Sequence, residues 1–178
     1  MSGGYVVWLT GLPCSGKTTI ARMLEERMKG NGVGVEVLDG DEVRRNLSPD
    51  LGFSREDREV HAKRVAFVSR LLSRNGVVAV VALISPYNAF RQHVRDTVTN
   101  FVEVYVSCPV EVCMERDVKG MYRKALAGEI KEFTGVDDPY EEPENPEIVI
   151  RSQEMSPTES VDAILSWLRE NDLFNGTD

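Results

Sequence analysis

The chain has 178 residues, of which 42% are hydrophobic, so we expect one domain (residues 1–178) with a sizeable core of its own. Its net charge of −8 argues against general nucleic-acid binding, and no apolar run approaches the length of a membrane span, so we expect neither a nucleic acid nor a membrane as partner. Three cysteines without metal-ligand spacing (Cys14, Cys108 and Cys113) and no apparent signal peptide predict a soluble protein in the reducing cytoplasm.

The first segment combines a strand with a phosphate-binding loop. An apolar run over 5–9 predicts the strand, and residues 11–18, which follow it directly, match the P-loop pattern G-x-x-x-x-G-K-[ST]. In such a loop, backbone N–H groups cradle phosphates, Lys17 reaches the β and γ phosphates, and the Thr18 hydroxyl holds Mg²⁺. A glycine-rich turn without a ligand is the alternative, but strand, loop and following helix all favour a bound nucleoside triphosphate.

Helices and strands alternate along the rest of the chain. Apolar residues at helical spacing predict helices over 17–28, 53–75 and 110–116. Apolar runs predict strands over 34–38, 77–84, 101–107 and 148–150. This order predicts an α/β protein with the three-layer P-loop NTPase fold, in which helices cover both faces of a central parallel sheet of about five strands.

Two of the predicted helices carry start signals. Ser54 precedes the long helix and can cap it together with Asp57. The apolar stripe of that helix consists of Val60, Phe67, Val68, Leu71 and Leu72. Ser156 and Glu159 form a capping box, with Pro157 at the first helical position, for a last helix. Its inward face is expected to consist of Val161, Ile164, Leu165 and Leu168.

Residues 117–145 break the alternation. The interval contains several glycines and prolines and few aliphatic residues, which predicts that it lies outside the core. A disordered linker is one interpretation. Its lysines, arginines and aromatic residues favour the other, a mobile lid that closes over phosphates.

Two aspartates end the second strand, at the sheet edge where this fold binds its ligands. One carboxylate, Asp39 or Asp41, can support the Mg²⁺ shell while the other orients or deprotonates an attacking hydroxyl. A plain Asp-Gly turn is the alternative. The phosphate loop upstream and Arg44 one turn further on favour a functional site.

Other candidate residues lie on the long helix and after the next strand. Arg58 and His61 share a helix face and can grip an anion, although His61 fits equally well as a surface histidine. Ser85 can donate to a ligand or merely start a turn. Basic residues gather over 44–64 and 116–131, where they indicate either sites for small polyanions or solvated helix faces. Cys14 occupies a variable position of the phosphate loop, where amides can lower a thiol pKa, but we interpret it as filler.

On these residues the chain resembles the adenylylsulfate kinases, which use MgATP to phosphorylate the 3′-hydroxyl of adenosine 5′-phosphosulfate. The matching segments are GLPCSGKTT (11–19), LDGDEVR (38–44), LGFSREDR (51–58), LISPY (83–87) and the lid sequence over 116–147. The lid is the most specific of them, because P-loop kinases in general do not share it. The resemblance implies the family's reaction in sulfate assimilation, with 3′-phosphoadenosine 5′-phosphosulfate and ADP as products.

The resemblance also implies roles for individual residues. Catalysis falls to Lys17, Asp41 and Lys119, and ATP is bound by Gly11, Leu12, Pro13, Cys14, Ser15, Gly16, Lys17, Thr18, Thr19 and Arg116. The acceptor is bound by Asp41, Arg44, Phe53, Arg58, His61, Ile84, Ser85, Lys119 and Phe133, with the two phenylalanines around its adenine. Mg²⁺ is held by Thr18 and, through water, by Asp39 and Asp41. A homodimer is expected from the family.

Ser85 and His61 carry further expectations. Ser85 is the serine discussed in this family as a phosphoenzyme site, although direct in-line transfer needs no covalent step. His61 stands where the family usually has Asn, so it changes the size of the side chain and can carry charge, which predicts an altered or pH-dependent affinity for the acceptor.

Two other classes of protein compete with this interpretation. Another small-molecule kinase, for a nucleoside monophosphate, shikimate or gluconate, would not explain Phe53, Phe133 and the lid together. A nucleotide switch or a binding-only regulator is disfavoured because the chain lacks an Asn-Lys-x-Asp guanine-reading sequence and retains its catalytic candidates.

Overall fold

Five parallel strands form one sheet in the order β2-β3-β1-β4-β5 in a computed structural model that describes residues 3–176. The central strand β1 (Val6–Thr10) pairs with β3 (Val78–Ala82) on one side and with β4 (Phe101–Ser107) on the other. The edges are β2 (Val35–Asp39) and β5 (Ile148–Arg151). The predicted strands are therefore confirmed. The strands β2 and β3 lie on one side of β1, whereas β4 and β5 lie on the other. In parallel sheets with such an order, ligands bind in a crevice at the carboxyl ends of the strands, where the order reverses.

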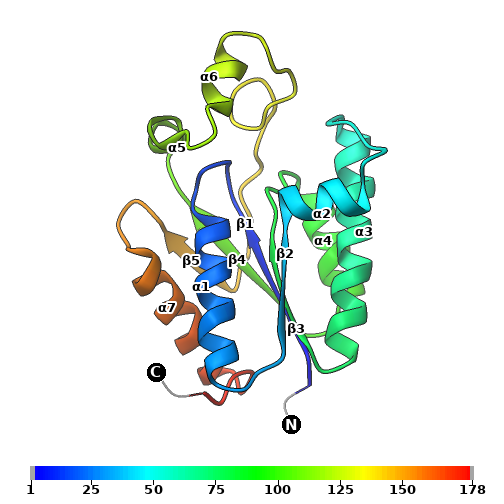
Figure 1. Cartoon of the computed structure of the whole chain (residues 1–178), viewed down its shortest axis with the longest axis vertical. Coiled ribbons are helices and arrows are strands. Elements are labelled where there is room, and N and C mark those ends of the chain that lie inside the picture. The colour runs from blue at the N-terminus through cyan, green and yellow to red at the C-terminus, as the bar shows by residue number, and fades with distance from the viewer. Residues whose placement is uncertain (1–2, 177–178) are drawn as a thin grey trace.

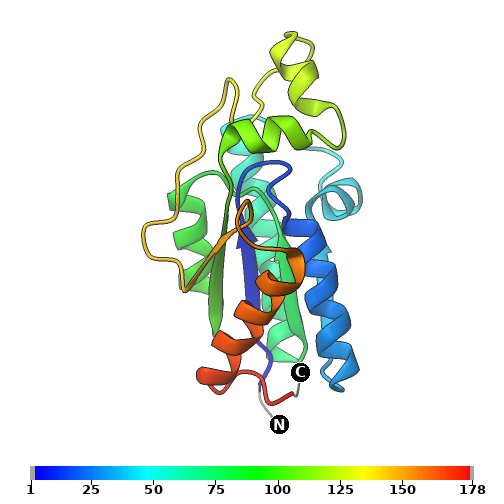
Figure 2. The same ribbon diagram turned by 90° about the vertical axis from the view of Figure 1, so that its left-hand side faces the viewer.

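Helices cover both faces of the sheet. Figures 1 and 2 show α1 (Lys17–Gly30) and α7 (Pro157–Glu170) side by side on one face. The other face carries α2 (Gly40–Leu47), α3 (Arg55–Arg74) and α4 (Asn88–Thr97). The predicted three-layer α/β architecture is confirmed.

The strand pleat divides the core into two layers. Val7 and Leu9 of β1 pack with α1 and α7, whereas Val6 and Trp8 pack with α3 and α4, and all four side chains are fully buried. Each fully buried aliphatic side chain contributes roughly 1.5–3 kcal/mol relative to an exposed one. The two layers together hold β1, and hence the start of the phosphate loop, in a fixed position.

The predicted helix starts are confirmed in detail. The Ser54 hydroxyl accepts the Asp57 N–H at 3.1 Å, and Ser156 and Glu159 form the reciprocal capping box with Pro157 in the first turn. The predicted inward residues of α7 are all fully buried. The short helix α5 (Val110–Arg116) has the predicted bounds.

The apolar stripe predicted for α3 is wrong in part, since of its members Leu72 packs against the core. Val60 and Phe67 are 40% and 52% exposed, and the face that packs on the sheet includes Ala62, Val65 and Ala66. Small side chains face the sheet because they allow close approach of the helix, whereas the larger ones remain outside or half-buried. Periodicity located the helix correctly but not the face that it buries.

Three short helices were not expected. The segment after β2 continues as α2 beyond the Asp-Gly turn, because Asp39 caps it through the Asp41 N–H. Helix α4 follows the turn after β3, and α6 (Met121–Leu126) lies in the lid. All three have ten residues or fewer, too short for a clear apolar period.

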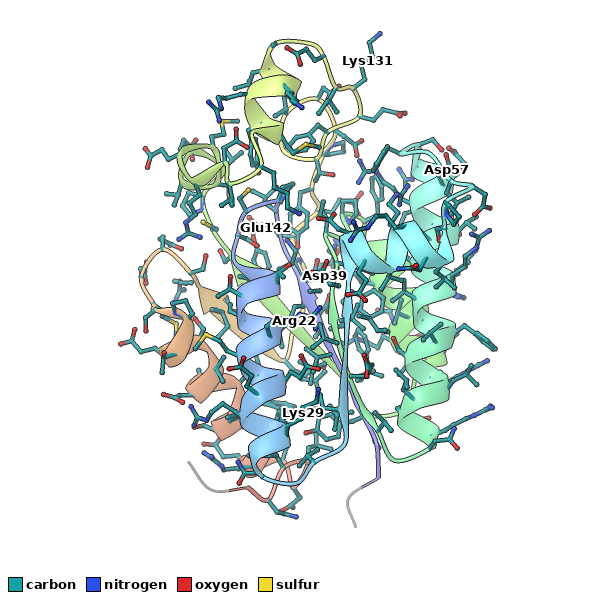
Figure 3. All side chains as sticks on the ribbon, viewed as in Figure 1. Arg22, Lys29, Asp39, Asp57, Lys131 and Glu142 are labelled. Atoms are coloured by element: carbon teal, nitrogen blue, oxygen red, sulfur yellow. The ribbon has the colours of Figure 1, made fainter. Side chains whose placement is uncertain are left out.

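The lid, residues 117–145, covers the carboxyl edge of the sheet (Figure 2). The expectation that it lies outside any core is wrong in part, since Tyr122 is 1% exposed and packs with Cys108 and Cys113. Asp117 holds the start of α6 by accepting the N–H groups of Tyr122 and Arg123 at 2.9 and 3.1 Å. Lys131 lies at the tip and points away from the sheet (Figure 3). Within the described range, no helix has the length and apolarity to cross a bilayer.

Candidate active site

The phosphate loop connects β1 to α1 at the carboxyl edge of the sheet (Figure 1). Gly11 has φ +154°, and a Cβ added there would lie 2.5 Å from the Val106 carbonyl oxygen. Gly16 precedes α1 with φ +108°, and the fully buried Ser15 donates its N–H to the Leu12 carbonyl at 3.2 Å. This tight backbone, open at a helix N-terminus, suits a phosphate cradle.

Lys17 folds back into the loop and is only 8% exposed. Its Nζ donates to the carbonyls of Gly11 and Leu12 at 2.9 and 2.7 Å and lies 3.4 Å from Ser15 Oγ. Burial lowers the pKa of Lys17 to about 8. Phosphate oxygens that replaced these carbonyls would give the buried ammonium a charged partner.

Thr18 and Asp39 form the part of the site that fits Mg²⁺. Thr18 Oγ1 donates to Asp39 Oδ2 at 2.7 Å, and Figure 3 shows Asp39 at the end of β2 beside α1. A hydroxyl and a carboxylate are the hard oxygen ligands that Mg²⁺ takes in kinases, together with substrate phosphates and water. Between residues 3 and 176, no group of three or more His, Cys, Asp or Glu side chains is arranged to hold a metal.

Asp41 and Lys119 join α2 to the lid. Lys119 Nζ forms an ion pair with Asp41 Oδ2, and the two side chains are 64% and 66% exposed. The bond to Asp41 raises the pKa of Lys119. The charge of Asp41 also favours the protonated form of Lys17, so the three predicted catalytic residues act on one another electrostatically or by direct contact.

The first end of the lid rests on the phosphate loop. Arg116 Nη1 donates to the carbonyls of Cys14 and Ser15, each at 3.4 Å, and Tyr122 donates its hydroxyl to the Pro13 carbonyl at 3.0 Å. The predicted ATP-binding residue Arg116 is therefore placed beside the rest of that set. Thr19 lies in the first turn of α1 with an exposed side chain.

Arg44 and Arg58 lie around Phe53. The Arg44 guanidinium lies 4.4 Å from the Phe53 ring centroid and donates to the Gly52 carbonyl, while Arg58 Nε donates to the Phe53 carbonyl at 2.8 Å. Burial, and next the charge of Arg58, lower the pKa of Arg44. Two guanidinium groups that repel each other make a favourable place for an anion.

Arg58 also links the backbone at Phe53 to the backbone next to Phe133, the two predicted adenine-binding residues. It donates to the Glu132 carbonyl, next to Phe133, and pairs with Asp138 at 3.7 Å. Phe53 is 56% exposed, unusual for a large aromatic residue. Phe133 is half-buried, with its ring edge-on to Tyr122 at 5.0 Å.

His61 is not a surface histidine. It is 5% exposed on the inner face of α3, with Nδ1 2.9 Å from Ser48 Oγ, and Nε2 is buried without a hydrogen-bond partner among the described residues. Burial, followed by the charges of Arg44 and Arg64, lowers the pKa of His61 to about 4. A lowered pKa favours the neutral imidazole near pH 7, and an altered or pH-dependent affinity for the acceptor stays a prediction.

Ile84 and Ser85 form a turn directly after β3. Ser85 has φ +42°, is 7% exposed, and its hydroxyl accepts the indole N–H of Trp8 at 2.8 Å. The Ile84 carbonyl accepts the Thr10 hydroxyl at 2.7 Å. The Ser85 hydroxyl is thus engaged in the fold, which weighs against a phosphoserine.

Several residues that hold this turn were missed. Trp8 and Thr10 belong to β1, where the sequence indicates only burial, although Thr10 directly precedes the phosphate loop and a polar residue there is a usable signal. Arg91 and Tyr140 also contact the turn or its neighbours. Nothing in the sequence relates either of them to residue 85.

Comparison with known proteins gives the same assignment. The family model described as adenylylsulphate kinase matches residues 3–151. An adenylyl-sulfate kinase of Rippkaea orientalis is 55% identical over 94% of this chain and 92% of its own, and a probable one of Pseudomonas aeruginosa is 53% identical over 94% and 81%. The structure of the Mycobacterium tuberculosis APS kinase with AMPPNP and APS has a TM-score of 0.91 and 38% identity, and the match covers 95% of this chain and 99% of that one. The chain therefore belongs to the adenylylsulphate kinase family and is an ATP-dependent kinase that acts on adenylyl sulfate.

Proposed function

We propose that this kinase forms one domain over residues 1–178 with a lid over 117–145, and that MgATP and adenosine 5′-phosphosulfate bind on either side of Asp41. The observation that carries the proposal is the pair Asp41 and Lys119. Asp41 lies on α2 three residues before Arg44, whereas Lys119 lies on the lid that rests on the phosphate loop. The Mycobacterium relative was solved with AMPPNP and APS together, which supports a ternary complex here.

On the ATP side, the phosphates occupy the loop of residues 11–19 and replace the carbonyls that Lys17 now contacts. Arg116 borders the same loop. Thr18 holds Mg²⁺, with Asp39 and Asp41 acting through water. When bound, the ion neutralises charge on the phosphate oxygens.

On the acceptor side, Phe53 and Phe133 stack on the adenine, and Arg44 and Arg58 bind the phosphosulfate. Ile84 and Ser85 contribute backbone contacts, and His61 supports the end of α2 through Ser48. Aromatic faces suit purine stacking, and paired guanidinium groups suit a doubly charged anion.

For the transfer, Asp41 orients the 3′-hydroxyl and accepts its proton. The hydroxyl oxygen bonds to the γ-phosphorus while the bond to the bridging oxygen breaks, so that ADP leaves. Lys119 leaves Asp41 and binds the phosphoryl or sulfate oxygens. Lys17, Arg116 and Arg123 offset the charge that develops on the transferring phosphoryl group. Closure of the lid excludes water, and no phosphoserine is needed.

An ADP-release assay with a panel of acceptors tests this function. We expect turnover with adenosine 5′-phosphosulfate but not with AMP, shikimate, gluconate or no acceptor, and its loss in Asp41→Ala. Asp96→Ala, an exposed aspartate on α4, serves as the control. Turnover with another acceptor, or phosphosulfate binding without turnover, would contradict the proposal.

We further propose that the protein is cytoplasmic, because unpaired thiols such as the three free cysteines persist in a reducing compartment. We also propose that it forms a homodimer. On the outer face of α3, Val60 and Phe67 lie between an acidic start (Glu56) and a basic end (Arg70 and Arg74), with Lys63, paired with Glu59 at 2.6 Å, between the two apolar side chains. Two copies packed antiparallel would pair acidic with basic ends around the apolar centre. Light scattering should report a dimer for the wild type and a monomer for Phe67→Asp, whereas a wild-type monomer would refute it.

A further inference from the structure

Arg91 on α4 is a charged residue in the core, 2% exposed. Its Nε lies 3.0 Å from Glu103 Oε1 on β4, and Glu103 is also buried. Arginine is rarely buried without a specific set of partners, because removing its charge from water is costly. The other partners of Arg91 therefore indicate what the buried charge does.

The guanidinium group joins the start of its own helix to two other segments. Nη1 donates to the Ser85 carbonyl in the turn after β3. Nη2 donates to Asn88 Oδ1 at the start of α4 and to the Glu141 carbonyl in the last part of the lid. One rigid, planar group thus fixes the proposed acceptor turn relative to the second end of the lid.

Further bonds attach the lid to the same turn. The Glu141 N–H donates to the Pro86 carbonyl at 2.8 Å, and Glu141 Oε2 accepts the Asn88 N–H at 2.7 Å. The hydroxyls of Tyr140 and Thr10 are hydrogen-bonded at 2.9 Å. Arg91 is hydrogen-bonded to both parts: to the turn through the Ser85 carbonyl and to the lid through the Glu141 carbonyl.

The conformation of the turn explains why it needs such support. Ser85 has φ +42°, which residues with a side chain adopt only when their surroundings enforce it. The Ser85 carbonyl is held by Arg91 and its hydroxyl by Trp8. Without the guanidinium group, the Ser85 carbonyl would lose this donor. The turn would keep the bonds from Trp8, Thr10 and the Glu141 N–H.

We propose that Arg91 is a positioning residue for the acceptor: it fixes the Ile84–Ser85 turn and the second end of the lid in one geometry, and its loss weakens binding of adenosine 5′-phosphosulfate more than binding of ATP. The inference rests on the proposed acceptor site. ATP is affected less because the first end of the lid is attached to the phosphate loop through Arg116 and Tyr122.

The test is Arg91→Lys, which keeps the charge beside Glu103 but loses the planar set of bonds. We expect KM for adenosine 5′-phosphosulfate to rise at least about tenfold, while KM for ATP stays within about twofold. Arg95→Lys is the matched control, since Arg95 lies on the same helix and contacts Glu103 at 3.1 Å and Glu147. It should leave both KM values within about twofold.

A second variant tests the proposal if Arg91→Lys folds poorly. Asn88→Ala removes one acceptor of the guanidinium group without emptying the core, and should raise KM for the acceptor selectively, by about two- to fivefold. Equal changes in both KM values, or a lower Tm with unchanged kinetics, would show a merely structural role. Wild-type enzyme without turnover or binding of the phosphosulfate would instead overturn the proposed function and the acceptor named here.

Discussion

The phosphate loop and the acceptor site differ in how the chain builds them. The phosphate loop consists of consecutive residues, 11–18, fixed by β1 and α1. The proposed acceptor site combines α2, the start of α3, the turn after β3 and the proposed lid, and Arg58 alone spans 74 positions to reach the Glu132 carbonyl. In the proposed arrangement, binding of ATP is therefore a property of a local motif, whereas binding of the acceptor depends on tertiary structure and on the lid.

The largest effect is expected from Lys17→Met, which tests the phosphate-loop side of this comparison. Loss of the only ammonium group buried in the loop should lower kcat by about 10²- to 10³-fold, the effect of removing one preorganised donor in other enzymes. The Tm should not fall, because the buried ammonium is costly, as its lowered pKa of about 8 shows. ADP release and thermal unfolding measure the two effects.

Lys29→Met is the control for this variant. Lys29 lies at the opposite end of α1 (Figure 3), where it pairs with Glu25 at 2.7 Å. Its removal should leave kcat unchanged. A reduction of less than about tenfold in Lys17→Met would show that the loop backbone acts without the ammonium.

The next largest effect is expected from Phe53→Ala on the acceptor side. Loss of one stacking face costs about 1–3 kcal/mol, so KM for adenosine 5′-phosphosulfate should rise about 5- to 150-fold while KM for ATP stays the same. Because Phe53 is 56% exposed, the Tm should change little. Phe53→Tyr keeps the ring and should restore most of the affinity; equal losses in both variants would argue against stacking.

The same contrast explains what could be predicted from sequence. Strands and the phosphate loop follow from local patterns, and their positions were predicted closely. The residues of the acceptor site were assigned largely through the resemblance to a family, since no periodicity relates Phe53 to Phe133. Arg91 was missed because α4 is too short to predict and its partners Ser85 and Glu141 lie on separate segments. On α3, periodicity could not show that small residues face the sheet.

His61→Asn tests the acceptor side through the pH dependence of stability. The pKa of His61 is about 4 in the folded protein against 6.5 in a free histidine, so the unfolded chain binds more protons between these values. Stability should therefore fall as the pH drops through this window, by about 2 kcal/mol near pH 5, and be unaffected near pH 7. Urea unfolding of both proteins at the two pH values measures it. The variant should lose this part of the pH dependence, and identical slopes would mean that His61 titrates normally.

The smallest effect concerns the first end of the lid. Tyr122→Phe removes the hydrogen bond to the Pro13 carbonyl but keeps the ring against Phe133. A single neutral hydrogen bond contributes about 1 kcal/mol, so KM for ATP should rise about two- to fivefold and KM for the phosphosulfate less. Initial rates with either substrate varied measure both constants. Since Arg91→Lys is expected to give the opposite selectivity, the two variants together assign each end of the lid to one substrate, and a larger rise for the phosphosulfate in Tyr122→Phe would show that the lid acts as one unit.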